Sequence, residues 1–323
     1  MLNDTMNHFN FVKEFGQAGY FETDHHKQIV REVKTSIIQG KLIAITGIVG
    51  CGKTLIMRQI QKALRNEKKI LICKSLSVDK DRVTIPVLMT AMFYDLSSEK
   101  TLKIPSHPEK RIRMLTDLIR KKKRPVALFI DEAHDLHGKT LVGLKRLMEV
   151  VQDSGNTLSI VLAGHPKLKN DLRRSSIEEI GSRAFILNLE GIIANKAEYL
   201  EWLFKNCIKS GTQIDTLISS DAIDIAAKRL VSPLQIQHYL SLAFDEAFRI
   251  GTKPVTSDII ESVIARDIDH LEPKLARSGY NVKTISGILN LRPAIIKSFL
   301  HGQLSPERTQ EIHKDMVTAG IAV

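Results

Sequence analysis

The chain has 323 residues, of which 43% are hydrophobic and 26% charged, and it carries 11 excess positive charges at neutral pH. This length accommodates one large core domain and one or two smaller ones, and the composition excludes a disordered, collagen-like or coiled-coil protein. The positive charge favours a polyanionic partner, because each neutralised phosphate releases condensed counterions. A basic protein that is merely soluble is the open alternative.

The cysteines and the N-terminal residues bear on the compartment. Cys51, Cys73 and Cys207 have neither the even number of a disulfide framework nor the spacing of a zinc site. No stretch reaches the roughly 18 apolar residues that span a bilayer, and the first 20 residues contain polar and charged residues where a signal peptide would be apolar. These features predict a cytoplasmic protein that does not associate with a membrane.

Short apolar segments rich in β-branched residues alternate with amphipathic, helix-length segments over the first 190 residues. The apolar segments are 42–46, 68–76, 125–130, 157–164 and 184–189. Strands that alternate with helices predict an α/β fold, with a doubly wound parallel sheet.

The character of the chain changes after Glu190, where the strand signal stops. Helical periodicity follows at roughly 195–209, 220–230, 233–250 and 256–268, and then comes a short basic segment. The expected division is an α/β nucleotide-binding domain with N-terminal helices over 1–190, a helical lid domain over 191–270, and a helix-turn-helix-like domain over 271–323.

A phosphate-binding motif follows the first predicted strand. The segment GIVGCGKT, Gly47–Thr54, fits G-x-x-x-x-G-K-[ST] at every defined position and opens a predicted helix near Lys53. Its backbone N–H groups would wrap the phosphates, Lys53 would reach the β and γ phosphates, and the Thr54 hydroxyl would bind Mg²⁺. The residues expected to contact ATP are Gly47, Ile48, Val49, Gly50, Cys51, Gly52, Lys53, Thr54 and Leu55.

A second motif ends the apolar segment 126–130. Asp131 is placed to hold Mg²⁺, and Glu132 is placed to orient the attacking water, because ligands bind at the carboxyl ends of α/β strands. The tetrapeptide DEAH is typical of helicases, but the chain is too short for a second motor domain. His134 and His137, without further ligands, are interpreted as surface histidines.

Together these motifs resemble the AAA+ ATPases typified by the secretion ATPase ExeA and the transposition regulators TnsC, TniB, MuB and IstB, over roughly residues 15–250. The resemblance implies that His26 lies near adenine, that His165 senses the γ-phosphate, and that Arg183 acts as an arginine finger on the ATP of a neighbouring subunit. A satisfied loop histidine is the alternative for His165, and Arg173 and Arg174 are rivals of Arg183.

The chain departs from these relatives at one position, and the resemblance also implies an oligomer. Ser232–Gln235 has no basic residue where relatives usually carry a sensor-2 arginine, which favours a slow switch. A finger supplied in trans requires a ring or helical homo-oligomer. In ring-forming relatives DNA lies in the pore, so the resemblance makes four cations DNA candidates: Lys80, Arg82, Lys139 and Lys145.

The basic C-terminal segment predicts two short helices. They cover about 282–289 and the residues after Pro293, around a turn at Asn290–Arg292. This spacing fits a helix-turn-helix in which Arg292, Lys297, Ser298 and His301 face DNA, and a protein-docking module is the alternative.

The sequence therefore predicts an ATPase that uses ATP and Mg²⁺, hydrolyses ATP to ADP and phosphate, binds double-stranded DNA and recruits a transposase. A replication or plasmid initiator is one alternative, and a signalling or scaffold ATPase is another.

Overall fold

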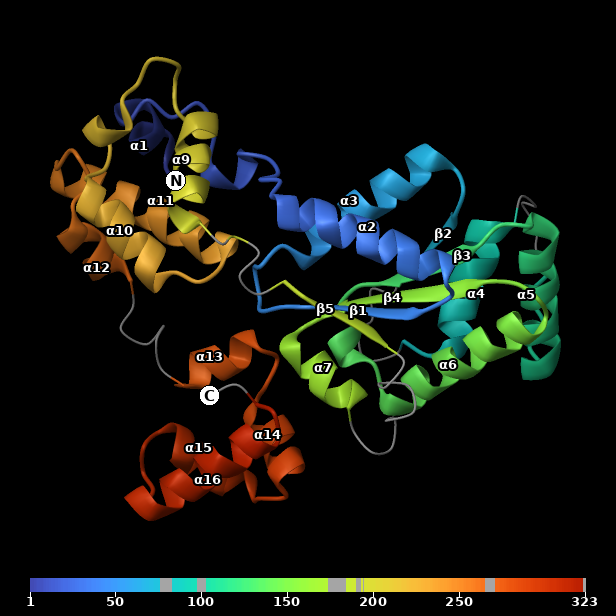
Figure 1. Ribbon diagram of the computed structural model, residues 1–323. Helices are drawn as coiled ribbons and strands as arrows, with labels where there is room; N and C mark the ends of the chain where they lie inside the picture. The colour runs from blue at the N-terminus through green and yellow to red at the C-terminus, as the bar shows by residue number, and fades with distance from the viewer. Residues whose placement is uncertain are drawn as a thin grey trace. The chain divides into compact units, whose positions relative to one another are not determined.

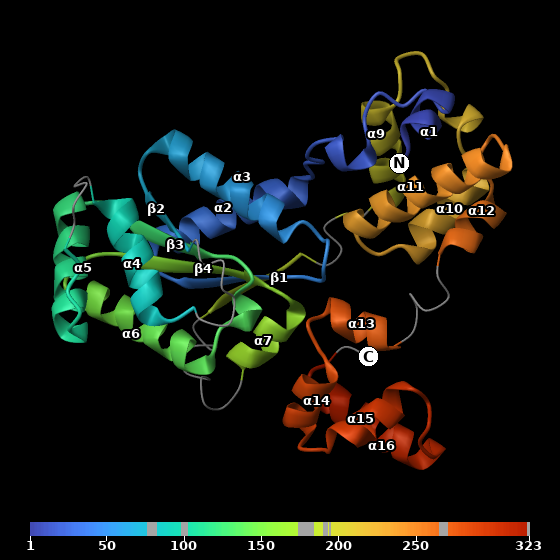
Figure 2. The same cartoon turned by 180° about the vertical axis from the view of Figure 1, so that it is seen from behind.

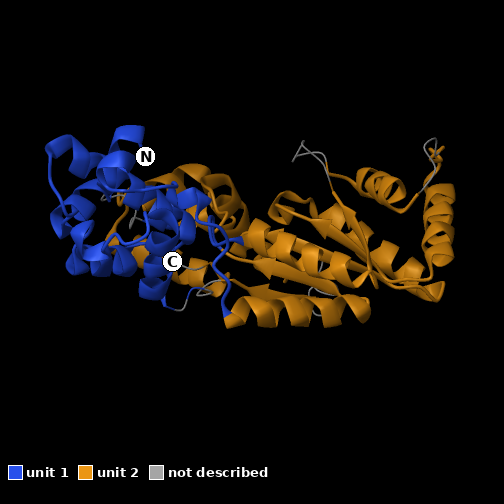
Figure 3. Cartoon of the chain, turned by 90° about the horizontal axis from the view of Figure 1, so that it is seen from above, with its two compact units in different colours: residues 1–23, 48–52, 190–274 blue, residues 24–47, 53–189, 275–323 orange. Residues whose placement is uncertain are grey.

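The computed structural model describes residues 1–75, 83–97, 103–173, 184–189, 193, 195–264 and 271–321. The chain divides into two compact units, coloured separately in Figure 3. The helical unit comprises 1–23, 48–52 and 190–274, and the sheet unit comprises 24–47, 53–189 and 275–323.

A parallel sheet is the centre of the sheet unit. Among the described residues its strands are β1 (Leu42–Thr46), β2 (Leu71–Lys74), β3 (Val126–Ile130), β4 (Leu158–Gly164) and β5 (Phe185–Asn188), in the order β2-β3-β4-β1-β5. Every residue of β1, β3 and β4 is buried, as expected for strands covered on both faces. The predicted α/β fold is confirmed, and each described strand lies within one of the predicted apolar segments.

Helices cover both faces of this sheet, as Figures 1 and 2 show from opposite sides. One face carries α2 (Asp24–Ile38) and α3 (Lys53–Glu67). The other carries α4 (Ile85–Leu96), α6 (Gly138–Asp153) and α7 (Pro166–Leu172), and α5 (Pro108–Lys122) packs on α4 and α6.

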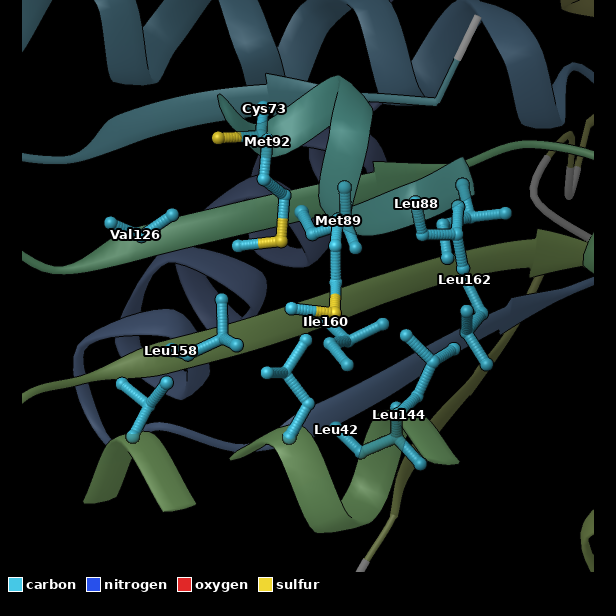
Figure 4. Close-up of a cluster of buried hydrophobic side chains, with 14 of the residues drawn as sticks. Leu42, Cys73, Leu88, Met89, Met92, Val126, Leu144, Leu158, Ile160 and Leu162 are labelled. Carbon is cyan, nitrogen blue, oxygen red and sulfur yellow. The ribbon is translucent and has the colours of Figure 1, made fainter. Parts of the chain in front are cut away.

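The core of the second face is aliphatic and sulfur-containing (Figure 4). Met89 and Met92 of α4 and Leu144 of α6 lie in one buried cluster with Leu158 and Ile160 of β4. Burying a side chain of this size contributes about 1.5–3 kcal/mol, so this cluster fixes β4 and the loop that follows it.

The last described residues, 275–321, belong to the sheet unit and are called the C-terminal module. After α13 (Leu271–Arg277) it holds α14 (Val282–Leu289), α15 (Pro293–Leu300) and α16 (Pro306–Thr318). Asn281 caps α14 by accepting a hydrogen bond from the Thr284 N–H at 2.9 Å. Asn290 ends α14 in the left-handed conformation that a glycine would otherwise supply.

The helical unit has an aromatic core. It contains α1 (Asn3–His8), α9 (Lys196–Cys207), α10 (Ser220–Arg229), α11 (Pro233–Ile250) and α12 (Ser257–Val263), together with two short 3-10 turns, Phe15–Gln17 and Ile214–Thr216. Phe9 and Phe11 both meet Phe244 edge to face, with ring centroids 4.9 Å apart in each pair. The N-terminal segment is thus part of this core.

Two sequence expectations remain partly open. The last predicted helix, 256–268, is described only to Val263, and 265–270 lie outside the described residues. The division into three functional domains remains a prediction. Within the described part of the chain, no helix combines the length and the apolar character that a bilayer span requires.

Candidate nucleotide site

The phosphate-binding motif forms the connection between β1 and α3. Gly50 and Gly52 have φ angles of +78° and +99°, which residues with a Cβ rarely adopt, so the loop needs glycine at these two positions. Helix α3 begins at Lys53, and its first N–H groups and positive dipole end are available to an anion.

Lys53 is held inside the fold. Its side chain is 6% exposed, and its Nζ donates a hydrogen bond to the Gly47 carbonyl at 2.9 Å. The Lys53 ammonium group is therefore bound to the first residue of its own motif, which means that its side chain points back towards the start of the loop.

The magnesium-type ligands expected from the sequence lie together. The Thr54 hydroxyl donates to Asp131 Oδ2 at 2.8 Å, and the Glu132 N–H donates to Asp131 Oδ1 at 2.9 Å. Asp131 follows β3 and Thr54 lies in the first turn of α3, so long-range folding creates this pair. A hydroxyl and a carboxylate are hard oxygen donors that fit Mg²⁺.

Glu132 follows Asp131 in a left-handed conformation, with φ 52° and ψ 36°. Such a conformation costs a residue with a side chain roughly 1–3 kcal/mol, and it concentrates at functional sites. The turn η3 (Ala133–Asp135) begins directly afterwards, so the glutamate leaves the strand at a sharp angle.

Two histidines lie against the Glu132 carboxylate. Its Oε2 is 3.3 Å from His134 Nδ1 and 3.7 Å from His165 Nε2, and the two imidazole rings stack with centroids 3.7 Å apart and planes 16° apart. A metal ion shared by two imidazoles lies about 2 Å from each nitrogen and near both ring planes, which parallel stacked rings do not permit. These three residues therefore form a contact cluster and not a ready-made metal site.

The interpretation of His134 as a surface histidine is wrong, whereas His137 is exposed. The His134 side chain is 11% exposed. Burial lowers the pKa of His134, and the carboxylates of Asp135 and Glu132 oppose this shift. The sequence did not reveal that His134 is buried, because His165, on which it stacks, lies in a distant part of the chain.

The glycine before His165 allows this close packing. A Cβ on Gly164 would lie 2.9 Å from Leu168 Cδ2 and 3.1 Å from the His134 backbone nitrogen. A side chain at this position would push η3 away from the end of β4, and with it the Glu132 backbone.

The helical unit contains a second contact of the phosphate loop. A Cβ on Gly50 would collide with the Leu234 side chain and lie 3.0 Å from Ser232 Oγ. Ser232 caps α11 by accepting from the Gln235 N–H at 3.3 Å. The stretch that lacks the sensor-2 arginine therefore touches the phosphate loop through uncharged groups, and the Leu234 N–H also donates to the Gly50 carbonyl at 3.4 Å.

The remaining expected site residues have varied surroundings. His26 lies buried in α2, and burial, followed by the nearby His25, lowers its pKa to about 4. Lys145 pairs with Glu149 at 3.3 Å. Within the described part of the chain, Cys51 is buried and the following are exposed or partly exposed: Ile48, Val49, Leu55, Lys139, Arg173, Arg292, Lys297, Ser298 and His301. Lys80, Arg82, Arg174 and Arg183 lie outside the described residues.

Part of the chain is similar to known proteins. Residues 37–172 match the AAA domain family. The chain is 28% identical over 153 residues to General secretion pathway protein A of Aeromonas hydrophila, which confirms the resemblance to the secretion-ATPase group. This match covers 45% of the chain and spans only 26% of that protein's length.

Solved structures share the fold over nearly the whole chain. The ORC2 protein of Aeropyrum pernix, solved as ADPNP-ADP complexes, has a TM-score of 0.54 at 12% identity and covers 96% of this chain and 90% of its own. A chain of Drosophila ORC bound to DNA has a TM-score of 0.52 at 14% identity, covering 99% and 79%. Residues 37–172 of this chain are therefore similar to the AAA domain family, and the α/β fold is shared with these ORC structures.

Proposed function

We propose that the protein is an ATPase that couples ATP binding and hydrolysis to binding of double-stranded DNA. The observation that carries the ATPase assignment is the Thr54–Asp131 hydrogen bond of 2.8 Å, with Glu132 next in the chain. Matching motifs can occur by chance in a sequence, but their convergence in the fold is a much stronger indication.

The chain's own groups divide the work of phosphoryl transfer. Lys53 would exchange its bond to the Gly47 carbonyl for phosphate oxygens, and Thr54 and Asp131 would hold Mg²⁺. The ion, when bound, neutralises charge on the β and γ phosphates. Glu132 orients the attacking water, and Arg183 of a neighbouring subunit completes the site, so turnover depends on a homo-oligomer.

The C-terminal module supports the DNA assignment. Helices α14 and α15 flank the turn at Asn290–Arg292, and Arg292 and Lys297 are exposed at the start and on the surface of α15. In a helix-turn-helix the second helix enters the major groove. The excess of 11 positive charges and the fold shared with DNA-bound ORC support the same partner.

Within this class we place the protein among regulators of transposition, which assemble on target DNA and recruit a transposase. The resemblance of its motifs to the group of TnsC, TniB, MuB and IstB motivates this role. A replication or plasmid initiator that reads a defined DNA site is the second candidate, because the fold shared with ORC proteins extends over the C-terminal module.

The central test compares ATP turnover with and without duplex DNA, and DNA co-sedimentation with ATP and with ADP. DNA-stimulated turnover and ATP-dependent binding are expected. Equal weak binding with both nucleotides contradicts the switch, and a footprint at one defined sequence favours the initiator. If the protein hydrolyses ATP but does not bind DNA, and DNA does not stimulate its turnover, the result favours an ATPase whose C-terminal module docks proteins.

The DNA-binding face is tested by replacing Arg292 and Lys297 with alanine. Each lost phosphate contact should reduce the salt slope of binding by about 1. For the single variant Lys297→Ala, the exposed Lys314 of α16 provides the matched control, because its replacement by alanine removes the same single charge from another helix. Equal losses in the two proteins contradict recognition through α15.

A further inference from the structure

The start of α7 is completed by a segment more than a hundred residues away. The first N–H groups of a helix have no partner within it, and the residue before α7, His165, makes no side-chain cap. The Lys167 N–H instead donates to the Ser278 carbonyl at 3.2 Å. The C-terminal module therefore caps the helix that follows β4.

A single side chain of α7 holds both ends of this module. Asn170 Nδ2 donates to the Tyr280 hydroxyl and to the Gly320 carbonyl, the latter at 2.7 Å. Tyr280 is 3% exposed, and its hydrogen bond with Asn170 is partly buried. The module is therefore fixed to α7 at the beginning and at the end of its sequence.

Gly279 brings the module against His165. Its φ is +87°, and a Cβ built on it would lie 2.8 Å from His165 Cβ and 2.9 Å from His165 Nδ1. Real Cβ atoms do not approach other atoms so closely. The position of the His165 ring therefore depends on the absence of a side chain at 279.

His165 leads from this contact to the hydrolytic side of the nucleotide site. Its Nε2 lies 3.7 Å from Glu132 Oε2, and its ring stacks on His134. Lys167, whose N–H binds the module, also donates from Nζ to the His134 carbonyl at 3.3 Å. The module therefore contacts His165 directly through Gly279. It reaches His134 indirectly, because Ser278 binds Lys167 and Lys167 binds the His134 carbonyl.

We propose that Gly279 is a positioning residue for ATP hydrolysis, and that the C-terminal module sets the place of His165 beside Glu132. A ligand that shifts the module then changes turnover at the ATP site. This inference rests on the proposed role of Glu132 in directing water. It adds a mechanical route by which binding at the module reaches that glutamate.

The test is Gly279→Ala compared with Gly287→Ala. Gly287 belongs to the same module, in α14, and a Cβ there meets nothing within 4 Å. We expect Gly279→Ala to lower kcat roughly 10–100-fold, because displacement of a positioned group by about 1 Å has effects of that size. The KM for ATP should stay unchanged, since the phosphate loop is untouched, and Gly287→Ala should retain normal kinetics.

Two further measurements separate positioning from loss of folding. Amide hydrogen exchange at the start of α7 should rise in Gly279→Ala and not in Gly287→Ala, while the thermal midpoint of each protein reports the fold. Tyr280→Phe removes one of the two acceptors of Asn170 and should lower kcat in the same direction by a smaller factor.

The outcomes are distinguishable from failure of the proposed function. A wild-type protein that hydrolyses no ATP, even with DNA, overturns the ATPase proposal and this inference with it. Normal wild-type turnover with equal kcat in Gly279→Ala and Gly287→Ala overturns the inference alone. The inference is also overturned if Gly279→Ala lowers kcat, raises the KM for ATP and lowers the thermal midpoint together.

Discussion

The proposed nucleotide site has a phosphate side and a hydrolytic side, and their construction differs. On the phosphate side, Lys53 and Thr54 belong to one short motif. The fold adds Asp131 to it, and Gly50 of the same motif contacts Ser232 and Leu234. On the hydrolytic side, Glu132 meets His134 and His165, and His165 in turn rests on Gly279. The phosphate side therefore takes its ammonium and hydroxyl groups from one motif, whereas on the hydrolytic side Glu132, His165 and Gly279 come from three separate parts of the sequence.

This difference indicates where regulation can act. Because Lys53 and Thr54 are neighbours in the first turn of α3, their relative positions are kept as long as α3 is folded. The hydrolytic side can change when a distant segment moves, because each of its contacts crosses between elements. We therefore expect nucleotide binding and nucleotide hydrolysis to respond separately to mutation.

The largest expected effect is on turnover in Glu132→Gln. Loss of the group that orients the water should lower kcat by roughly 10²–10⁴-fold, with ATP affinity retained. Single-turnover hydrolysis and equilibrium binding of a fluorescent ATP analogue measure the two quantities. Glu149→Gln is the control, because Glu149 is an exposed glutamate of α6. If Glu132→Gln weakens ATP binding as much as it lowers turnover, the phosphate side and the hydrolytic side do not act separately.

The next effect is expected for Lys53→Ala, which should weaken both binding and turnover. Removal of one preorganised charged donor from a reacting group lowers kcat by roughly 10²–10³-fold. Isothermal titration with ATP, beside steady-state assays, checks this. Lys62→Ala controls for charge, since Lys62 is exposed on the same helix. Normal ATP affinity in Lys53→Ala contradicts the role of the buried ammonium group.

Thr54→Ala should act through magnesium. Removing a partner that orients a metal-binding carboxylate typically lowers metal affinity by about 10–100-fold. The Mg²⁺ concentration at half-maximal turnover should therefore rise by a factor in that range. Titration of Mg²⁺ at saturating ATP gives this factor. Thr54→Ser keeps the hydroxyl bonded to Asp131 and should behave like the wild type. An unchanged requirement in the alanine variant means that Thr54 does not serve the ion.

The smallest expected effect concerns acid stability and His26. Its pKa is about 4 in the fold and 6.5 in the unfolded chain, so between these values the unfolded chain binds more protons. Stability linked to His26 is complete above pH 6.5 and is lost as the pH falls towards 4. His26→Gln should reduce this loss, with a change in thermal midpoint of roughly 2–4 °C per kcal/mol. His25→Gln removes the smaller, electrostatic cause of this shift and should reduce the loss by less than His26→Gln does. Identical pH profiles for all three proteins contradict the assignment.

The sequence predicted the fold and the phosphate side because both are encoded locally. Alternating segments identified the strands, and the spacing within Gly47–Thr54 identified the loop. His134 was misinterpreted because no spacing in the sequence shows that it stacks on His165. The contact of Gly50 with Ser232 and Leu234 also joins segments far apart in the chain, and a local pattern carries no information on such pairs.

The close approach of Gly279 to His165 also constrains how the two positions can vary during evolution. They share one small volume, so a larger residue at one position is tolerated only if the other position becomes smaller or the backbone withdraws. The positive φ disfavours most replacements at 279, and this places most of the freedom at 165. Homologues that keep the glycine can therefore exchange the histidine for another narrow polar side chain, whereas homologues that lose the glycine should have rebuilt the loop after β4.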